Sequence, residues 1–418
     1  MISYQDKKVT VVGLARSGLA AARLLKKLGA DVTVTEAKRS EQYECLAREL
    51  GEEGVVVELG GHSRAAVAGR DLLVLSPGAR LDALPVVWAG EEHIEIVSEL
   101  ELAASVCPAT IIAITGTNGK TTTTTLVGDV LKAAGRRAFV LGNIGMPFSA
   151  KVLEMKKEDY VSLEVSSFQL ETIHAFHPRV AVILNLTPDH LDRYRDVADY
   201  LEAKKRVYMN QDRADWLILN ETDAALRALA AEAPARVLFF GKNAQDAEFD
   251  QNQQAVLAVA AALGLDRRAC LEVFKNFKGV EHRIEFVRVL DGVEYLNDSK
   301  ATNIDSTVWA LRNIKKPVVL IAGGRDKGSD FASIGELVRQ KVKFVVLTGE
   351  ASDRIAAAWH DVVLLEQVTT FEQAVRRARQ HARTGDCVLF SPMCKSFDMF
   401  TDYEHRGRTF KEIVGRLR

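Results

Sequence analysis

Short apolar runs recur along the whole chain, and most of them end in a polar turn that contains glycine. Examples are residues 9–12, 180–184 and 317–322, and stretches of helical period separate each run from the next. Continuous apolar runs of this length are typical of parallel strands that are buried on both faces, because a half-exposed strand would show alternating polar positions. The pattern therefore predicts an α/β protein.

The predicted strands fall into three groups, which indicates three consecutive α/β domains. A chain of 418 residues is too long for one hydrophobic core, so several domains are expected. We place a Rossmann-like domain at 1–98, a P-loop ATPase-like central domain at 99–279 and a second Rossmann-like domain at 280–418. The alanine-rich stretch 220–265 is predicted to be helical. The strands of the three groups are 9–12, 31–36 and 71–75, then 111–115, 160–165 and 180–185, then 317–322, 343–347 and 387–390.

A glycine turn follows the first strand of the second group and leads directly into a helix. Glycines in such a turn let backbone N–H groups close around phosphate oxygens, and the helix N-terminus adds partial positive charge. Lys120 is expected to reach the terminal phosphates, and Thr121 to offer its hydroxyl to Mg²⁺. A standard P-loop would have glycine where this chain has Ile114, so the motif is a shorter form. The turn predicts an ATP site made of Gly116, Thr117, Asn118, Gly119, Lys120, Thr121 and Thr122.

The first segment has the order strand, glycine turn, helix, strand, and Glu36 ends its second strand. Dinucleotide sites are built in this way, although Ala15 stands where the middle glycine of that motif would be. The turn at Gly78, after another strand, is placed to supply more backbone donors at the same sheet edge. Two interpretations stay open here: a nucleotide-binding crevice, or a Rossmann-like unit whose crevice is empty.

Three polar residues of the second group are candidates for the chemistry. Glu164 lies in an otherwise apolar strand, where an unpaired carboxylate would cost roughly several kcal/mol, so we expect it to hold Mg²⁺. His190 lies in the polar loop after strand 180–185, at the edge where α/β sheets place their ligands. Asn143 lies in a glycine turn, where it either orients a phosphate or acyl oxygen or only forms the turn.

Polar tracts follow three strands of the third group. They cover 297–303, 323–328 and 391–398, and the second of them contains Lys327, a cation suited to a carboxylate. Because the carboxyl ends of parallel strands meet at one edge of a sheet, these tracts predict one composite pocket for a small charged ligand.

The charge balance argues against polyanionic partners. The chain has 55 Lys and Arg and 56 Asp and Glu, a formal net charge of -1, so no net field attracts nucleic acid or an anionic membrane. The five cysteines form no CxxC pair, and the sequence shows neither a signal peptide nor an apolar run of about 18 residues. We expect a cytoplasmic monomer with reduced thiols.

Together these motifs closely resemble the Mur ligase family, and most closely its D-glutamate-adding members. The resemblance spans all three predicted domains, with the motifs in the family's order. It implies an ATP-dependent amide ligase of peptidoglycan synthesis that works in the cytoplasm. Such an enzyme activates the alanyl carboxylate of UDP-N-acetylmuramoyl-L-alanine as an acyl phosphate, which the amine of D-glutamate then attacks. The residues that carry the resemblance are 116–121, 163–170, 185–192, 282–283, 297–303, 391–398 and 406–407.

The resemblance also implies roles in nucleotide and metal binding. Lys120 would hold the β and γ phosphates, while Thr121 and Glu164 would hold one Mg²⁺. His190 and Lys204 would support a second Mg²⁺, with Lys204 converted by CO₂ to a carbamate. An anionic carbamate suits a divalent cation, whereas an ammonium group would be repelled by it.

The substrate sites implied by the resemblance involve the first and third domains. Arg283 and Asp298 correspond to nucleotide-contacting positions of the third domain. Asn143 stays a candidate for both catalysis and substrate binding. The D-glutamate positions are Lys300, Thr302, Lys327, Ser396 and Tyr403, and the uridine diphosphate positions are Gly13, Arg16, Ser17, Gly18, Glu36 and Gly78.

The chain departs from the family at the adenine contacts. The usual His-Asn-x-x-Asn run is replaced by 250–254, in which Gln251 and Gln254 serve with one extra methylene or Asn252 serves in a shifted register.

Two rival functions are weaker. A folate-extending or other amide ligase of the superfamily is disfavoured, since the folate enzymes lack a separate uridine-binding domain before the phosphate loop. A nicotinamide-dependent oxidoreductase or nucleotide-sensing module that uses the first segment would leave Lys120, Glu164 and His190 unexplained.

Overall fold

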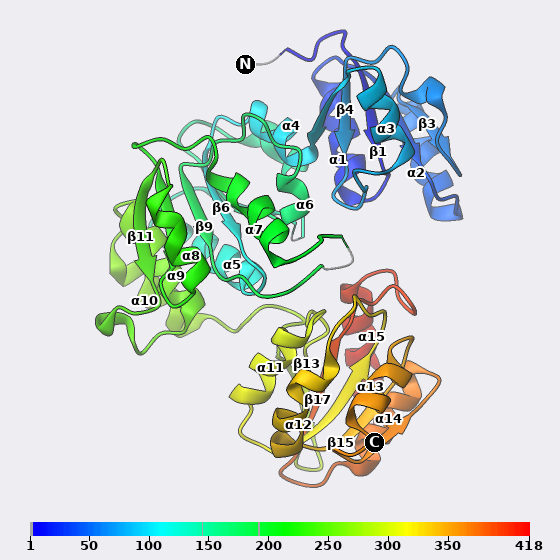
Figure 1. Ribbon diagram of the computed structural model, residues 1–418, viewed down its shortest axis with the longest axis vertical. Helices are drawn as coiled ribbons and strands as arrows, with labels where there is room; N and C mark the ends of the chain where they lie inside the picture. The colour runs from blue at the N-terminus through cyan, green and yellow to red at the C-terminus, as the bar shows by residue number, and fades with distance from the viewer. Residues whose placement is uncertain (1–2, 144, 191–192) are drawn as a thin grey trace. The chain divides into compact units, whose positions relative to one another are not determined.

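Three sheets of mainly parallel strands organise the chain, as the apolar runs predict (Figure 1). The computed structural model describes residues 3–143, 145–190 and 193–418. Two units are formed, one from residues 1–186 with 198–277 and the other from 187–197 with 278–418. Leu191 and Asp192 of the predicted 185–192 motif lie outside the described residues. None of the described helices is both long and apolar enough to cross a membrane.

The first sheet has the strand order β3-β2-β1-β4-β5, and every pair is parallel. The sequence prediction missed β3 and β5, because these edge strands are partly exposed and lack a long apolar run. The elements are β1 (Lys8–Val12), α1 (Arg16–Lys27), β2 (Asp31–Glu36), α2 (Glu41–Glu52), β3 (Val56–Leu59), η1 (Arg64–Ala66), β4 (Leu72–Leu75), α3 (Leu84–Glu91), β5 (Glu95–Ser98) and α4 (Glu99–Ser105).

The second sheet has the order β11-β10-β9-β6-β8-β7 and is also parallel throughout. The expectation of a helical 220–265 stretch was wrong at β11, an edge strand whose sequence RVLFF is β-branched and aromatic. The strands are β6 (Thr110–Thr115), β7 (Ala138–Gly142), β8 (Tyr160–Glu164), β9 (Val180–Ile183), β10 (Trp216–Asn220) and β11 (Arg236–Phe240). The helices are α5 (Lys120–Ala133), η2 (Phe148–Ala150), η3 (Val152–Glu154), α6 (Ser167–Leu170), α7 (Val197–Lys205), η4 (Arg206–Tyr208), α8 (Ala224–Ala228), η5 (Leu229–Ala231), η6 (Ala244–Asp246), α9 (Gln251–Ala262) and α10 (Arg267–Asn276).

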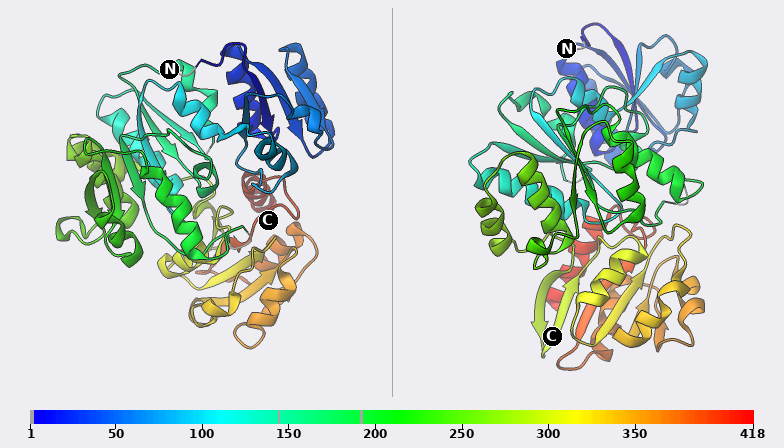
Figure 2. Two further views of the ribbon diagram at one scale, coloured as in Figure 1. Left: turned by 45° about the horizontal axis from the view of Figure 1, so that its top comes forward. Right: turned by 60° about the vertical axis from the view of Figure 1, so that its left-hand side comes forward.

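The two faces of the second sheet belong to different cores. Ile112 and Ile114 of β6 pack into a core with α5, α9 and α10, which lie together on one face (Figures 1 and 2). Ile111 and Ala113 point to the other face, in a core that continues to Val9 of the first sheet. This alternation follows from the two-residue repeat of a strand. The first two sheets therefore share one continuous apolar core.

The third sheet, in the second unit, has the order β12-β13-β17-β14-β15-β16. The three predicted strands of this group, β14, β15 and β17, pair in parallel, whereas β12, which the apolar pattern did not predict, pairs antiparallel with β13. Asp291 and Gly292 connect these strands with φ of 50° and 74°, the two positive values that a tight hairpin turn requires. The elements are β12 (Glu285–Leu290), β13 (Val293–Asn297), α11 (Ile304–Asn313), β14 (Val318–Gly323), η7 (Phe331–Ile334), α12 (Gly335–Lys341), β15 (Val342–Leu347), α13 (Ser352–Trp359), β16 (Leu365–Gln367), α14 (Phe371–His381), β17 (Cys387–Met393) and α15 (Tyr403–Arg416).

Helices cover both faces of the third sheet. Val318 and Leu320 of β14 pack with α11, α12 and α13, whereas Val319 and Ile321 pack with α14 and α15 (Figure 1). The carboxyl ends of β13, β14 and β17 lie at one edge, so the polar tracts that follow these strands are brought together.

Candidate functional site

The predicted phosphate loop lies between the end of β6 and the start of α5. Gly119 is the N-cap of α5 and has a φ of 83°, a left-handed conformation that favours glycine. The amides of Thr117 and Asn118 donate to Oδ1 of Asn185, at 3.1 and 2.8 Å, and Asn185 Nδ2 donates back to the Asn118 carbonyl at 3.0 Å. The shape of the loop is therefore fixed from the adjacent strand β9. The sequence motif contained Asn185 without giving it a role; its signal was its place just after a strand that pairs with β6.

Two lysines converge on this loop. Lys120 Nζ folds back to the carbonyls of Gly116 and Thr117, at 2.9 and 2.8 Å. Lys204, on α7, is 1 % exposed and donates to the same Gly116 carbonyl at 2.9 Å. Its Nζ also lies 4.2 Å from the centroid of the Tyr200 ring, a cation–π contact. The loop thus holds two ammonium groups at one carbonyl oxygen.

The neighbouring Lys205 has a different environment. It forms ion pairs with Glu202 and Glu232, at 3.1 and 2.7 Å, on the surface of α7. Only the family resemblance distinguished Lys204 from Lys205 in the sequence, and the structure separates them by burial and by contact with the loop.

Glu164 ends β8 as the centre of a buried polar cluster. The carboxylate is 2 % exposed, and its Oε2 accepts from the Thr121 hydroxyl at 2.7 Å. Its Oε1 accepts from Asn143 Nδ2 at 2.9 Å, so Asn143 orients the carboxylate from the turn after β7. A carboxylate and a hydroxyl this close are hard oxygen donors of the type that Mg²⁺ prefers. The residues present therefore fit the metal that the sequence predicts here.

The predicted uridine residues gather at the carboxyl edge of the first sheet. Both oxygens of Glu36 accept backbone amides, from Leu14 and Lys38, each at 2.9 Å. A Cβ on Gly18 would overlap the Gly13 carbonyl, so α1 begins in close contact with the turn after β1. Arg16 Nη1 donates to the Gly145 carbonyl at 3.3 Å. Ser17 lies in the first turn of α1, and Gly78 is exposed in the turn after β4, which pairs with β1.

The three candidates for the adenine contact differ in their surroundings. Gln251 is exposed, and its Nε2 donates to the Thr222 hydroxyl at 3.3 Å. Gln254 accepts from the Gly241 amide at 2.9 Å and donates to the Phe249 carbonyl at 2.8 Å, so both ends of its amide hold backbone. Asn252 lies against the phosphate loop, where its Oδ1 accepts from the Thr123 hydroxyl at 3.3 Å. A Cβ on Gly119 would overlap this Oδ1.

In the second unit, Asp298 is fully buried at the end of β13. It accepts from the Ser391 hydroxyl at 2.8 Å and from the Ile284 amide at 3.3 Å, and Arg283 Nη1 lies 3.9 Å from its Oδ1. Burial raises the pKa of Asp298 to about 6, although Arg283 acts to lower it. The predicted pair of Arg283 and Asp298 is thus brought together.

The residues expected to bind D-glutamate form two groups within this unit. Lys300 Nζ donates to the Tyr403 hydroxyl at 2.9 Å and lies 4.5 Å from the ring centroid, while Ser396 is 3 % exposed. Thr302 follows, with its amide bonded to the Lys300 carbonyl at 2.9 Å. Lys327 belongs to the second group.

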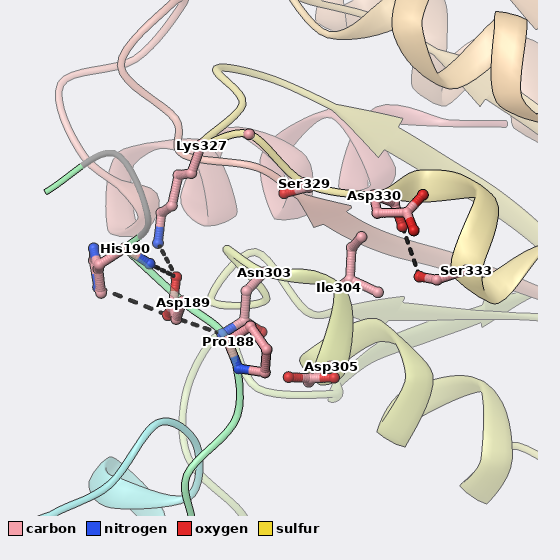
Figure 3. A pocket seen from close by; sticks show the side chains of 11 residues that line it. Pro188, Asp189, His190, Asn303, Ile304, Asp305, Lys327, Ser329, Asp330 and Ser333 are labelled. Carbon is pink, nitrogen blue, oxygen red and sulfur yellow. Dashed lines mark hydrogen bonds and ion pairs between the residues drawn. The ribbon is translucent and has the colours of Figure 1, made fainter. Parts of the chain in front are cut away.

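That second group surrounds a cavity of about 250 Å³ (Figure 3). Lys327 Nζ lies 3.0 Å from Oδ1 of Asp189, and Asn303 Nδ2 donates to Oδ2 at 3.1 Å. Burial acts to raise the pKa of Asp189, but Lys327, His190 and Asn303 together hold it well below its ordinary value. The predicted His190 lies beside Asp189 in this unit, with its Nε2 3.7 Å from the carboxylate. Sequence reasoning had not assigned Asp189 a role.

Comparison with protein families gives one match for each sheet. The Mur ligase MurD-like N-terminal domain matches residues 7–98, the Mur ligase middle domain matches 114–264, and the Mur ligase glutamate ligase domain matches 282–394.

Two curated relatives match the chain at full length. The protein from Geotalea daltonii is 41 % identical over 447 residues, covering 100 % of this chain and 99 % of its own length. The protein from Pelotomaculum thermopropionicum is 40 % identical over 452 residues, covering 99 % of each chain. Both are named UDP-N-acetylmuramoylalanine--D-glutamate ligase.

Among solved structures, the pseudomurein peptide ligase type C from Methanothermus fervidus is similar with a TM-score of 0.61 and 17 % identity. The match covers 99 % of this chain and 100 % of that one. At this level of identity the likeness shows the fold alone.

Proposed function

Since this chain belongs to the Mur ligase family, as a full-length relative of enzymes named UDP-N-acetylmuramoylalanine--D-glutamate ligase, we propose that it joins D-glutamate to UDP-N-acetylmuramoyl-L-alanine at the expense of ATP. Its product would serve peptidoglycan synthesis, and we place the step in the cytoplasm with the chain acting as a monomer. The observation that carries the proposal is the glycine loop with Lys120, set beside the buried pair of Thr121 and Glu164.

ATP binding is assigned to the loop and to the start of α5. Backbone amides of the loop and the positive end of the helix suit phosphate oxygens, and the Lys120 ammonium suits the β and γ phosphates. Thr121 and Glu164 would hold a Mg²⁺, which would supply charge neutralisation as the phosphoryl group moves. Asn143 orients the carboxylate of Glu164 for this role. Arg283 and Asp298 are assigned to the nucleotide as well.

Chemistry of the proposed reaction follows from these charges. Transfer of the γ-phosphoryl group to the alanyl carboxylate gives an acyl phosphate and ADP, so that phosphate becomes a leaving group. The neutral amine of D-glutamate then attacks the carbonyl carbon, phosphate departs, and the amide forms with loss of the amine proton. Positioning and electrostatic stabilisation supply the rate, because the chain provides no covalent nucleophile in this scheme.

The family resemblance assigns a second metal to Lys204 and His190, which belong to different units of the structure, so the surroundings of Lys204 alone support this assignment. Lys204 is buried beside the phosphate loop, a position from which a carbamate would present an anion to a cation near the phosphates. Carbamylation would require Lys204 to release its present contact with the Tyr200 ring, since that contact stabilises an ammonium group.

We further assign the substrates to separate parts of the chain. Residues 1–98, with Gly13 and Glu36 at the sheet edge, would take the uridine diphosphate group; residues 99–279 would take ATP; residues 280–418 would take D-glutamate. Lys327 suits one carboxylate of D-glutamate, and the other D-glutamate residues assigned are Lys300, Thr302, Ser396 and Tyr403.

The test is phosphate release from ATP with UDP-N-acetylmuramoyl-L-alanine and one candidate amino acid at a time. We expect release with D-glutamate and none with L-lysine, diaminopimelate or L-glutamate. Release with L-lysine or diaminopimelate and none with D-glutamate would refute the substrate assignment. Oxidation of NADH, measured in parallel, tests the oxidoreductase alternative.

A further inference from the structure

The ion pair between Asp189 and Lys327 is buried, yet it faces a cavity. The two side chains are 8 % and 7 % exposed, and both line the space shown in Figure 3. Burying two charges costs several kcal/mol of desolvation, which their mutual attraction offsets only while they remain paired. A ligand that separates them must therefore supply a partner for each charge.

Asp189 is held in place independently of Lys327. Asn303 donates its Nδ2 to Oδ2 of Asp189, and its own Oδ1 accepts from the Ser306 amide as the N-cap of α11. The carboxylate is thus oriented from the start of a helix. If Lys327 turns away, Asp189 keeps two hydrogen-bond donors, Asn303 Nδ2 and the backbone amide of His190, which donates to Oδ1 at 2.8 Å.

An amino acid carries the two charges that would replace this pair. Its α-carboxylate complements Lys327 and its α-ammonium complements Asp189, and both groups stand on one carbon atom, as close together as the pair they would separate. A dicarboxylate without an amine could satisfy Lys327 only. It would leave Asp189 buried without the Lys327 ammonium and repelled by the ligand's own charge.

We propose that Asp189 is a specificity-determining residue, which receives the α-ammonium of D-glutamate when the amino acid binds, before the amine loses a proton and attacks, while Lys327 receives the α-carboxylate. A zwitterion can therefore separate the ion pair of the free protein, because it supplies a partner for both charges, whereas a simple dianion supplies a partner for Lys327 alone. This inference rests on the proposed function, because it assumes that the cavity admits the amino acid substrate.

The test is Asp189→Asn, which keeps the size of the side chain and removes its charge. A charge-assisted hydrogen bond contributes about 1.5–3 kcal/mol, so KM for D-glutamate should rise about tenfold to a hundredfold, while KM for ATP should change less than about twofold. Glutarate, which is D-glutamate without the amine, should inhibit the variant as well as or better than the wild type, because Lys327 is no longer neutralised. The ratio of KM for D-glutamate to Ki for glutarate should therefore rise.

Asp386→Asn is the matched control. Asp386 is also 8 % exposed and pairs with a lysine, Lys343, at 2.6 Å, but it lies outside the lining of this cavity. The Asp386→Asn variant should change the melting temperature about as much as Asp189→Asn does, with no change in the ratio of KM for D-glutamate to Ki for glutarate. If circular dichroism shows that Asp189→Asn does not fold, the same ratio of KM to Ki is measured for Asn303→Ser. Serine keeps the cap of α11 but loses the amide that orients Asp189.

Equal weakening of D-glutamate and glutarate, or no change in either, would overturn the inference. A wrong proposed function would give a different result from a wrong role for Asp189, because the wild type itself would then release no phosphate with D-glutamate. The variant is then assayed with whichever amino acid supports release, and a change of the ratio for that amino acid tests Asp189 alone.

Discussion

Gly119→Ala measures the contact between the phosphate loop and Asn252. The substitution imposes two separate costs. At a φ of 83° an alanine adopts a left-handed conformation, which costs about 1–2 kcal/mol. The new Cβ would also overlap Oδ1 of Asn252, and overpacking of this kind costs about 1–3 kcal/mol. The sum is about 2–5 kcal/mol of unfolding free energy.

A second substitution separates these two costs. Asn252→Ala alone loses one hydrogen bond with Thr123, worth about 1 kcal/mol. In the Gly119→Ala background it removes the overlap, so the double variant should lose less stability than the sum of the single variants, by about 1–3 kcal/mol. The backbone cost would remain.

Urea unfolding of the wild type, the two single variants and the double variant gives the coupling energy between Gly119 and Asn252. Titration of each protein with ATP and magnesium gives the accompanying loss of nucleotide affinity. We expect Gly119→Ala to weaken nucleotide binding at least about tenfold, and Asn252→Ala to restore part of it. Additivity within about 0.5 kcal/mol would refute the reasoning, because it would mean that Asn252 does not meet the loop at Gly119.

Three further predictions follow from single side chains. Lys120→Ala should keep the fold, by circular dichroism, and lower turnover at least about a thousandfold, because the ammonium group that neutralises the terminal phosphates would be lost; turnover near the wild-type rate would contradict the assignment. Lys204→Ala should be inactive but partly restored by formate or acetate, which would supply the missing anion, and no restoration in a folded variant would argue against the carbamate. The unfolding free energy should fall by up to about 3 kcal/mol between pH 4 and pH 6, because folded Asp298, with its pKa raised from 3.8 to about 6, keeps a proton that the unfolded chain releases. Asp298→Asn should not show this fall, and parallel urea-unfolding results for the two proteins at pH 4.5 and 6.5 would contradict the prediction.

Much of the fold could be predicted from the sequence, because central parallel strands are buried on both faces. Strands such as β6 and β14 are continuous apolar runs, and the glycine turn after β6 has a chemistry with few other uses. Edge strands gave no such signal. β3 and β16 are short and partly exposed, and β11 lies in a segment dominated by alanine. The antiparallel β12 was detectable from the Asp-Gly pair at 291–292, a hairpin-turn signal that does not depend on hydrophobic periodicity.

The candidate site was predictable where a residue type is unfavourable in its local surroundings unless it binds a partner. Glu164 is such a case, because a carboxylate in an apolar strand needs a partner, and Thr121 and Asn143 provide it. Contacts between distant segments were not predictable. Nothing local relates Asp189 to Lys327, 138 residues further along the chain, or Asn252 to Gly119.

The apolar core that runs beneath the first two sheets has a consequence for cooperativity. Val9 of one sheet and Ala113 of the other belong to a single cluster, which also includes Phe148. Neither sheet can melt without exposing the apolar surface that supports the other, whereas the third sheet has cores of its own. Three sheets should therefore give two calorimetric transitions, and a truncated chain that begins after α4 should aggregate.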